Sequence, residues 1–280
     1  MELLQWHKRF LDSLANDYTP NEITDLFKRL LIGFFDWEPT ILGLEPNRQL
    51  SIEQELQLSK ALEDITSHRP LQYILGHTYF MGLQIKVTPA TLIPRPETEE
   101  LVSWVLETHK YEAMNVLDIG TGSGCIALGV KHQRPNWTVH ALDVSEDALK
   151  VARKNSKQLA LDIQFIQTSI ANAQAENEYH IIISNPPYVT LEEKKEMKPN
   201  VLDYEPHLAL FVPPEDPLIY YEQIFQFAQT SLHRRGEIFL EINPHFCQAL
   251  QDLALSYGFQ KHRLRTDIFE KKRLLSLAYE

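Results

Sequence analysis

The sequence predicts an α/β fold in which a doubly wound, mainly parallel sheet follows a small helical bundle. Two observations carry this prediction. Apolar residues recur at helical spacing up to about residue 75, and beyond residue 96 short apolar strands alternate with helices. The chain of 280 residues is long enough for about two domains. We therefore expect a helical bundle over 1–75, a β-hairpin linker over 76–96 and a sheet domain over 97–280.

The first segment carries the start signals of its helices. Thr19-Pro20-Asn21-Glu22 is a capping box with proline at the first helical position, and Ser51 to Gln54 forms a second box. An earlier helix is expected from Leu3 to Leu14. The apolar stripes that follow the two boxes consist of Ile23, Leu26, Phe27, Leu30, Leu31 and Phe34, and of Leu56, Leu58, Leu62 and Ile65.

The remainder of the chain alternates between extended and helical patterns. Alternating apolar residues over 79–87 predict a hairpin, and the prolines that follow exclude a continuous helix there. A short helix is expected over 97–108. We expect strands at 115–119, 138–142, 163–167, 180–184, 236–242, 259–265 and 273–279. The helices between them include Ser145–Leu159 and Asp216–Leu232, the second with Asp216 as its cap and Pro217 at its first position.

Composition narrows the classes of function. Lys and Arg total 27 and Asp and Glu total 38, so the net charge of −11 disfavours a non-specific grip on nucleic acid. The helical segment has 7 basic and 12 acidic residues and accounts for −5 of that charge. Two cysteines outside any Cys/His cluster predict neither a disulfide framework nor a metal site. A signal peptide and a membrane-spanning apolar run are not recognisable, so we expect a cytoplasmic protein.

The first strand of the sheet ends in a glycine loop, Asp118-Ile119-Gly120-Thr121-Gly122-Ser123-Gly124. Glycines let the backbone turn tightly and let a ligand approach closely. A dinucleotide-binding loop would have its third glycine at Cys125, and the acid at the strand end is unfavourable beside a pyrophosphate. S-adenosylmethionine (AdoMet), with an ammonium, a sulfonium and no phosphate, suits the loop better. A purely structural turn is the alternative.

The second strand ends at an acid, Asp143. It lies 23 residues after Gly120, close to the offset of about 20 residues at which an acid meets ribose hydroxyls in folds of this type. Asp143 is therefore predicted to bind the ribose of the cofactor, and a place in the cap of the next helix is the alternative.

The fourth strand ends in Asn185-Pro186-Pro187-Tyr188, the most specific signal in the chain. The two prolines stiffen the turn. The side-chain oxygen of Asn185 and the carbonyl of Pro186 are two acceptors, and Tyr188 offers a flat apolar face. Acceptors that hold both hydrogens of one NH₂ group leave its lone pair facing a methyl donor, which suits a planar amide or an exocyclic amine. A turn without a role is the alternative.

Together, the glycine loop and the Asn-Pro-Pro-Tyr turn resemble class I AdoMet-dependent N-methyltransferases, which have a Rossmann-like seven-stranded sheet. Three further segments resemble the HemK/PrmC family of peptide chain release factor N5-glutamine methyltransferases. They are Arg69–Gly76 (RPLQYILG), Leu92–Glu99 (LIPRPETE) and Tyr204–Leu210 (YEPHLAL). The resemblance covers about residues 65–245, and IPRPETE is not shared by methyltransferases generally.

The resemblance implies a role for each matching position. The cofactor-binding residues would be Asp118, Gly120, Thr121, Gly122, Ser123, Gly124, Asp143, Ile170 and Asn185. The catalytic residues would be Asn185, Pro186 and Tyr188, and the pocket for the substrate glutamine would consist of Asn185, Pro186, Pro187 and Tyr188. Ile93 to Glu97 would border the cofactor and link the domains.

The resemblance also implies substrates and partners. AdoMet would be converted to S-adenosylhomocysteine, and the methyl acceptor would be the glutamine of the Gly-Gly-Gln motif in class 1 release factors. The helical domain would dock the release factor. We expect a monomer in a transient complex, with no stable nucleic-acid partner and no membrane.

Three segments depart from the family pattern. Thr168-Ser169-Ile170 stand where an acid and an aromatic residue often lie near the adenine, so Ile170 is expected to pack on the ring. Glu241-Ile242-Asn243-Pro244 replaces the usual Glu-x-Gly-like end of the fifth strand, and Asp267 to Glu270 lacks a common glycine.

Two alternatives stay open. An N6-adenine methyltransferase would use the same tetrapeptide on the exocyclic amine of adenine, but it would need a basic surface to hold phosphates, which a net charge of −11 disfavours. A non-catalytic AdoMet-binding protein would not need the intact Asn-Pro-Pro-Tyr turn.

Overall fold

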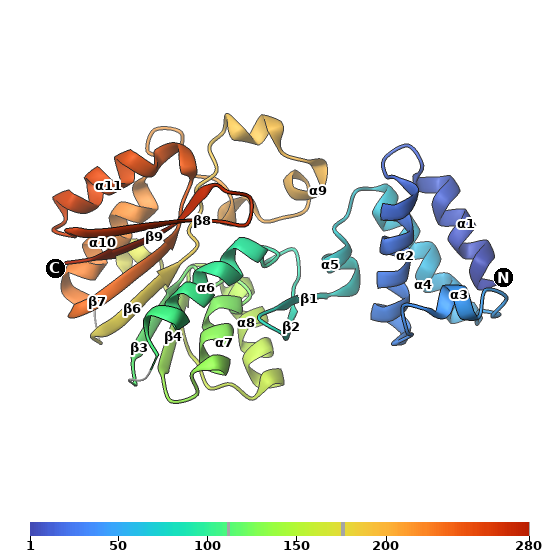
Figure 1. The fold of residues 1–280 in the computed structure, drawn as a ribbon, viewed down its shortest axis with the longest axis horizontal. Coiled ribbons are helices and arrows are strands. Elements are labelled where there is room, and N and C mark those ends of the chain that lie inside the picture. Colours follow the sequence, from blue (N-terminus) through green and yellow to red (C-terminus); the bar gives the residue numbers. More distant parts are fainter. Residues whose placement is uncertain (111–112, 175–176, 280) are drawn as a thin grey trace. The chain divides into compact units, whose positions relative to one another are not determined.

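The computed structural model describes residues 1–110, 113–174 and 177–279. The chain divides into two compact units, Met1–Gly76 with Pro199–Tyr204, and His77–Lys198 with Glu205–Glu280 (Figure 1). Across the described ranges, no helix has both the length and the apolar character needed to cross a membrane.

The first unit is helical, as expected. Its helices are α1 (Leu3–Leu14), α2 (Pro20–Phe35), α3 (Ile41–Leu44), α4 (Ile52–Thr66), α5 (Leu71–Leu75) and α9 (Pro199–Leu202). Both predicted capping boxes are confirmed: the backbone amide of Thr19 donates to Glu22 Oε2 at 2.8 Å, and that of Ser51 donates to Gln54 Oε1 at 2.9 Å. The predicted stripes supply most of the core, but Leu56 is wrong as a core residue because its side chain is 66% exposed.

Helix α9 joins the first unit from a distant part of the sequence. The hydroxyl of Tyr204 donates to the carbonyl of Ser67 at 2.5 Å, which ties residues 137 positions apart. The sequence pattern placed only the residues up to 75 in this unit, because four residues of helix give no periodic signal.

The second unit begins with the predicted hairpin. Strands β1 (His77–Phe80) and β2 (Leu83–Lys86) pair antiparallel, with Phe80 opposite Leu83. Helix α6 (Pro96–Thr108) follows, and its proline occupies the first turn, where a missing backbone N–H costs no helical hydrogen bond.

Within the described residues, seven strands form one sheet, in the order β5-β4-β3-β6-β7-β9-β8. They are β3 (Asn115–Ile119), β4 (Thr138–Asp143), β5 (Gln164–Gln167), β6 (Tyr179–Ser184), β7 (Leu232–Glu241), β8 (Lys261–Thr266) and β9 (Lys272–Ala278). Pairs among β5, β4, β3, β6 and β7 are parallel, and those of β9 with β7 and β8 are antiparallel. The predicted mainly parallel sheet is confirmed.

Helices and short turns connect the strands. They are α7 (Cys125–Gln133), α8 (Glu146–Leu159), α10 (Ile219–Ser231), α11 (Cys247–Ser256), and the 3₁₀ turns η1 (Ile170–Asn172), η2 (Glu193–Glu196), η3 (His207–Ala209) and η4 (Pro244–Phe246). The predicted start of α10 at Pro217 is wrong. The carboxylate of Asp216 accepts from the amide of Leu218, two residues on, and this local turn delays the helix to Ile219.

The order of the central strands determines where the site lies. Strand β3 lies between β4 and β6, so the direction of winding reverses between β3 and β6. Ligands of such sheets bind at this switch point, beyond the carboxyl ends of the strands. Ile119 and Ser184 pair in register, and the Ser184 hydroxyl donates to the Ile119 carbonyl at 2.7 Å. The glycine loop and the Asn-Pro-Pro-Tyr turn therefore leave the sheet side by side.

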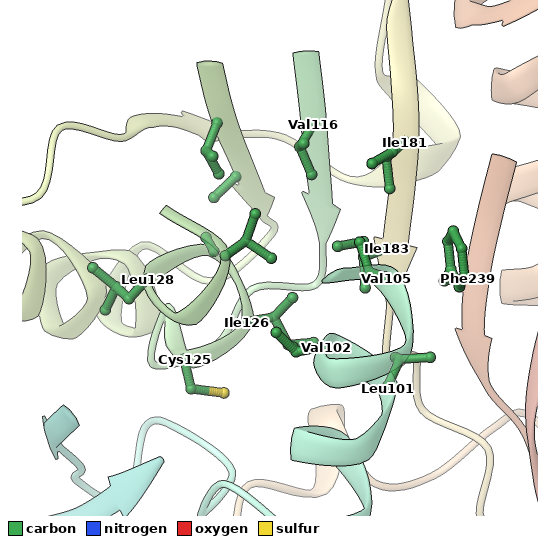
Figure 2. Close-up of a cluster of buried hydrophobic side chains, with 14 of the residues drawn as sticks. Leu101, Val102, Val105, Val116, Cys125, Ile126, Leu128, Ile181, Ile183 and Phe239 are labelled. Atoms are coloured by element: carbon green, nitrogen blue, oxygen red, sulfur yellow. The ribbon is translucent and has the colours of Figure 1, made fainter. Parts of the chain in front are cut away.

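Helices α6 and α7 cover one face of these strands. Figure 2 shows their apolar side chains against Val116, Ile181, Ile183 and Phe239 of β3, β6 and β7. The core fixes the first turn of α6 and the start of α7 relative to the strand ends. Cys125 is buried in it, which raises the pKa of its thiol to about 12, so this cysteine behaves as an apolar packing group.

Candidate active site

A cavity of about 310 Å³ lies at the carboxyl ends of β3, β4 and β6. Its lining comprises Ala90, Thr91, Leu92, Ile119, Gly120, Gly122, Leu142, Asp143, Val144, Ser145, Ala148, Thr168, Ser169, Ile170, Ser184, Asn185, Pro186, Pro187, Pro206, Leu208, Ala209, Tyr220, Gln223 and Ile224. This volume lies in the range of small-molecule sites, roughly 300–1,000 Å³. Of the described residues in this lining, only Asp143 is charged. The cavity therefore favours a cationic ligand over a phosphate.

The glycine loop is held to the end of β4. The amides of Gly120 and Thr121 both donate to the Leu142 carbonyl, at 2.9 and 3.0 Å. Gly122 has a φ of 56° and directs its amide to Asp143 Oδ2 at 2.8 Å. Gly124 has a φ of 83°, and a Cβ there would lie 3.2 Å from the Cβ of Ala152. Glycine at these last two positions lets the loop curl over the strand end and lets α7 pack closely on α8.

Asp118 lies beneath this loop and does not line the cavity. Its Oδ2 accepts from the Thr121 hydroxyl at 2.6 Å and from the amide of Ala127 at 3.2 Å, which ties the loop to the first turn of α7. Its Oδ1 has no hydrogen-bond partner in the described part of the chain. Burial is the main reason that the pKa of Asp118 rises to about 7.

Asp143 joins the glycine loop to the start of α8. Besides the Gly122 amide, it accepts from the amide of Ser145 at 2.8 Å. Burial raises the pKa of Asp143 above its usual range, and the backbone hydrogen bonds oppose this rise. Each carboxylate oxygen keeps a further lone pair, so Asp143 can accept from ligand hydroxyls while it holds the loop.

Asn185 follows β6 directly and lines the same cavity. Its Nδ2 donates to the hydroxyl of Thr98 at 3.1 Å. No hydrogen bond to Asn185 Oδ1 is found among the described residues. Asn185 thus offers an acceptor to a ligand at the cavity wall, next to Pro186, whose carbonyl is a second acceptor.

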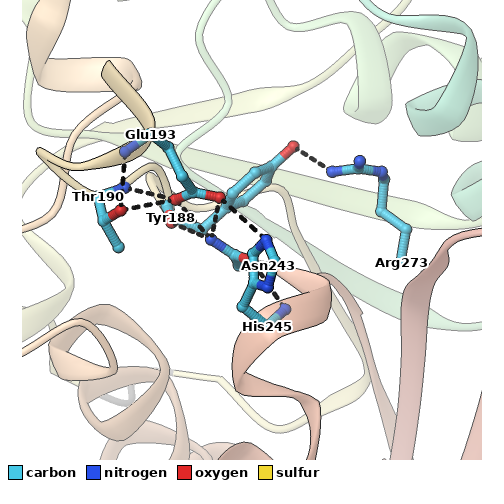
Figure 3. A network of polar contacts seen from close by, with 6 residues as sticks. All are labelled: Tyr188, Thr190, Glu193, Asn243, His245 and Arg273. Carbon is cyan, nitrogen blue, oxygen red and sulfur yellow. Dashed lines mark hydrogen bonds and ion pairs between the residues drawn. The ribbon is translucent and has the colours of Figure 1, made fainter. Parts of the chain in front are cut away.

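Tyr188 does not line the cavity. Its hydroxyl donates to Glu241 Oε1 at 2.7 Å and accepts from Arg273 Nη1 at 3.0 Å. Burial raises the pKa of Tyr188 well above its usual value, and the charge of Glu241 adds to this rise. In this structure the side chain anchors the turn, and Figure 3 shows its hydroxyl directed at Arg273.

A polar cluster fixes the exit of the turn (Figure 3). Asn243 Nδ2 donates to the carbonyl of Tyr188 at 3.1 Å and to the Glu193 carboxylate at 2.9 Å. Glu193 also accepts from the amide of Thr190 at 2.8 Å. The charged run over 192–198 is expected by default to be a mobile or solvated loop. Within it, Glu193 is partly exposed, and its carboxylate holds Thr190 and Asn243.

The structure brings part of the predicted site together. The predicted residues that line the cavity are Gly120, Gly122, Asp143, Ile170, Asn185, Pro186 and Pro187. Those that do not are Asp118, Thr121, Ser123, Gly124 and Tyr188. Sequence reasoning did not identify the cavity-lining residues Tyr220, Gln223 and Ile224 of α10, which belong to no motif. It also missed Thr98 as the partner of Asn185, although Thr98 lies within the IPRPETE segment.

The fold and the loop arrangement at its switch point define a methyltransferase. The family model "Methyltransferase small domain" matches residues 98–203, and "PrmC N-terminal domain" matches residues 2–76. A release factor glutamine methyltransferase of Flavobacterium psychrophilum is 39% identical, with 100% of both chains covered. That of Streptococcus pneumoniae is 38% identical, with 98% of both covered. The chain belongs to the release factor glutamine methyltransferase family, whose activity depends on AdoMet.

Solved structures confirm the fold. The hMettl16 catalytic domain in complex with MAT2A 3'UTR hairpin 6 has a TM-score of 0.60 and 17% identity, with 78% of this chain and 82% of that chain covered. A methyltransferase from Pyrococcus furiosus has a TM-score of 0.52 and 19% identity, with 71% and 89% covered. At sequence identities below 20%, this similarity shows a shared arrangement of the sheet and its flanking helices and nothing about the site.

Proposed function

We propose that this protein transfers the methyl group of AdoMet to the side-chain amide nitrogen of the glutamine in the Gly-Gly-Gln motif of class 1 release factors. One observation carries the proposal: Asn185 presents an unpaired carboxamide oxygen to a cavity whose described lining includes Asp143 as its only charged residue. Membership in the release factor glutamine methyltransferase family supports the same substrate.

The residues of the cavity fit AdoMet. The glycine loop would hold its methionine part, and the buried Oδ1 of Asp118, which has no hydrogen-bond partner among the described residues, lies below that loop. Asp143 would accept from the ribose hydroxyls, and Ile170 would pack on the adenine ring. When bound, AdoMet supplies an electrophilic methyl group on a sulfonium.

Asn185 and Pro186 would orient the substrate amide. Two acceptors take up both hydrogens of the NH₂ group, so its lone pair is directed at the methyl group and the entropic part of the barrier falls. The same acceptors stabilise the positive charge that develops on the nitrogen during transfer. The proton becomes acidic only as the new bond forms, so no general base has to act first.

The other expected roles belong to the same proposal. The first 75 residues, with an excess of five negative charges, would dock the release factor, and the sheet domain would carry out transfer in a transient complex of monomers. Such an enzyme works where translation terminates, in the cytoplasm. Electrostatic docking predicts that the complex weakens as the salt concentration rises.

The test is methyl transfer from radiolabelled AdoMet to a Gly-Gly-Gln release factor, with duplex and single-stranded DNA offered in parallel. We expect label on the release factor alone. A release factor with Gly-Gly-Ala in place of Gly-Gly-Gln is the matched control and should stay unlabelled. Label on DNA only would overturn the proposal in favour of adenine methylation, and label on neither would leave AdoMet binding without transfer.

A further inference from the structure

The amide nitrogen of Asn185 is held by a chain of hydrogen bonds that lies outside the cavity lining. Thr98 Oγ1 accepts from Asn185 Nδ2 at 3.1 Å and donates to Glu241 Oε2 at 2.7 Å. Thr98 and Glu241 are 2% and 1% exposed, so water does not compete for these bonds. Three segments meet here: the first turn of α6, the end of β7 and the residue after β6.

The direction of each bond in this chain is fixed by chemistry. Arg273 has donors only, so the Tyr188 hydroxyl accepts from it at 3.0 Å and directs its own proton to Glu241. Burial raises the pKa of Glu241, and the hydrogen bonds from Thr98 and Tyr188 and the charge of Arg273 oppose this rise. In its ionised form the carboxylate only accepts, so the Thr98 hydroxyl also directs its single proton to Glu241. The Thr98 oxygen can then only accept from Asn185.

This polarity decides which way the Asn185 carboxamide faces. With its NH₂ group on Thr98, Oδ1 is the atom left for a ligand in the cavity. A carboxamide turned by 180° would set its oxygen against the lone pairs of Thr98. It would also present a donor to the substrate NH₂ group, which needs an acceptor. The orientation required for transfer is therefore the one that the buried chain selects.

We propose that Thr98, with Glu241 behind it, is a positioning residue that orients the Asn185 carboxamide for methyl transfer. This proposal rests on the proposed function for its kinetic consequence but not for the orientation itself. It also gives a reason for the threonine in the Ile93–Glu99 segment: Pro96 starts α6, and the residue two positions later points its hydroxyl at the turn after β6.

Kinetics test the proposal with a threonine-to-valine pair. Thr98→Val keeps the shape of the side chain and removes the hydroxyl, so we expect kcat to fall about 10- to 100-fold while KM for AdoMet changes less than about threefold. Thr98→Ser restores the hydroxyl and should recover most of kcat. Thr108→Val is the matched control on α6, because among the described residues the Thr108 hydroxyl bonds to the Trp104 carbonyl in the same helix and to no part of the site.

Glu241→Gln provides a second variant of the same chain. A glutamine amide can donate to Thr98, which frees the threonine proton to donate to Asn185 Oδ1 and favours the turned carboxamide. We expect a loss of kcat of at least the size seen for Thr98→Val. Thermal unfolding of each variant checks that the fold is kept, and if Thr98→Val does not fold, Glu241→Gln carries the kinetic test.

A second readout does not depend on the substrate. The side-chain NH₂ resonances of Asn185 can be assigned by NMR from their loss in Asn185→Ala, and their exchange with solvent can be measured in the AdoMet-free protein. We expect one slowly exchanging proton in the wild type and in Thr98→Ser, and faster exchange in Thr98→Val. Unchanged exchange in Thr98→Val would overturn the proposal. Absence of turnover in the wild type, with the exchange difference present, would instead overturn the proposed function alone.

Discussion

The carboxylate of Asp143 accepts a hydrogen bond from the backbone amide of Gly122 at 2.8 Å. A hydrogen bond thus joins the acid at the end of β4 to the glycine loop after β3. Both residues line the same cavity, so a ligand that contacts one lies close to the other. The loop conformation and the acid that is expected to hold the ribose are therefore energetically coupled.

Replacing Asp143 should weaken cofactor binding. Asp143→Ala removes the acceptor for the amides of Gly122 and Ser145 as well as the expected contact with the ribose, so we expect the Kd for AdoMet to rise about 10- to 100-fold. Isothermal titration calorimetry measures this change. Asp147→Asn removes a negative charge four residues on, at an exposed position of α8, and should leave the Kd within about twofold. Equal effects of the two variants would contradict the role of Asp143.

Removal of the Asn185 carboxamide should abolish transfer without loss of the fold. Asn185→Ala takes away the acceptor at the cavity wall, and the loss of one such group typically lowers kcat by about 10²- to 10³-fold. Single-turnover methylation assays measure the rate, and circular dichroism with AdoMet titration shows whether the fold and the cofactor site are kept. Wild-type turnover in this variant would place the chemistry elsewhere.

Asp118 should make stability depend on pH. Its folded pKa of about 7 lies above the ordinary value of 3.8, so the folded protein holds this proton more tightly than the unfolded chain does. The stabilisation is fully present below about pH 4 and is lost as the pH rises towards 7. Asp118→Asn has no titrating carboxyl group at this position, so its stability lacks this pH-dependent contribution. Urea unfolding should show the variant gaining stability relative to the wild type between pH 4 and 7, by at most about 4 kcal/mol, and no further change above pH 7. A constant difference across this range would contradict the raised pKa.

A partly buried ion pair should hold the segment before α6. Glu205, buried, accepts from Arg95 Nη2 at 2.5 Å and from the amide of Ile93 at 3.0 Å. Glu205→Ala leaves that amide without its partner, and we expect a loss of about 3 kcal/mol in the free energy of unfolding. Glu107→Ala breaks an exposed pair with Arg265 and should cost less than about 1 kcal/mol. Chemical denaturation compares the two, and a similar cost for both would contradict a structural role for Glu205.

The regular secondary structure was largely predictable from the sequence. Apolar periodicity located the helices and the strands, and capping boxes fixed two helix starts, because these signals are local. The start of α10 was not predictable, since Asp216 can cap a helix or close a turn on Leu218 and only the tertiary context decides.

In the site, too, the residues within local motifs were predictable and their distant partners were not. Motifs placed the glycine loop, Asp143 and Asn185 at strand ends, and the order of the sheet brings those ends together. The partners of these residues were not predictable, because Thr98 meets Glu241 across 143 positions and Asn243 meets Tyr188 across 55. Hydrogen bonds over such distances leave no periodic signal in one sequence. Tyr188, predicted to line the substrate pocket, instead bonds to Glu241 in this structure, and its substrate role stays a prediction.

The assignment of Pro199–Tyr204 to the first unit bears on how the protein is made. A ribosome adds about 5–20 residues per second, so this segment emerges on the order of ten seconds after the first 76 residues. Until then Ser67 lacks the hydroxyl of Tyr204. The helical unit therefore reaches its final set of contacts only after strands β3 to β6 have been synthesised. A fragment that stops at residue 76 is an incomplete version of that unit.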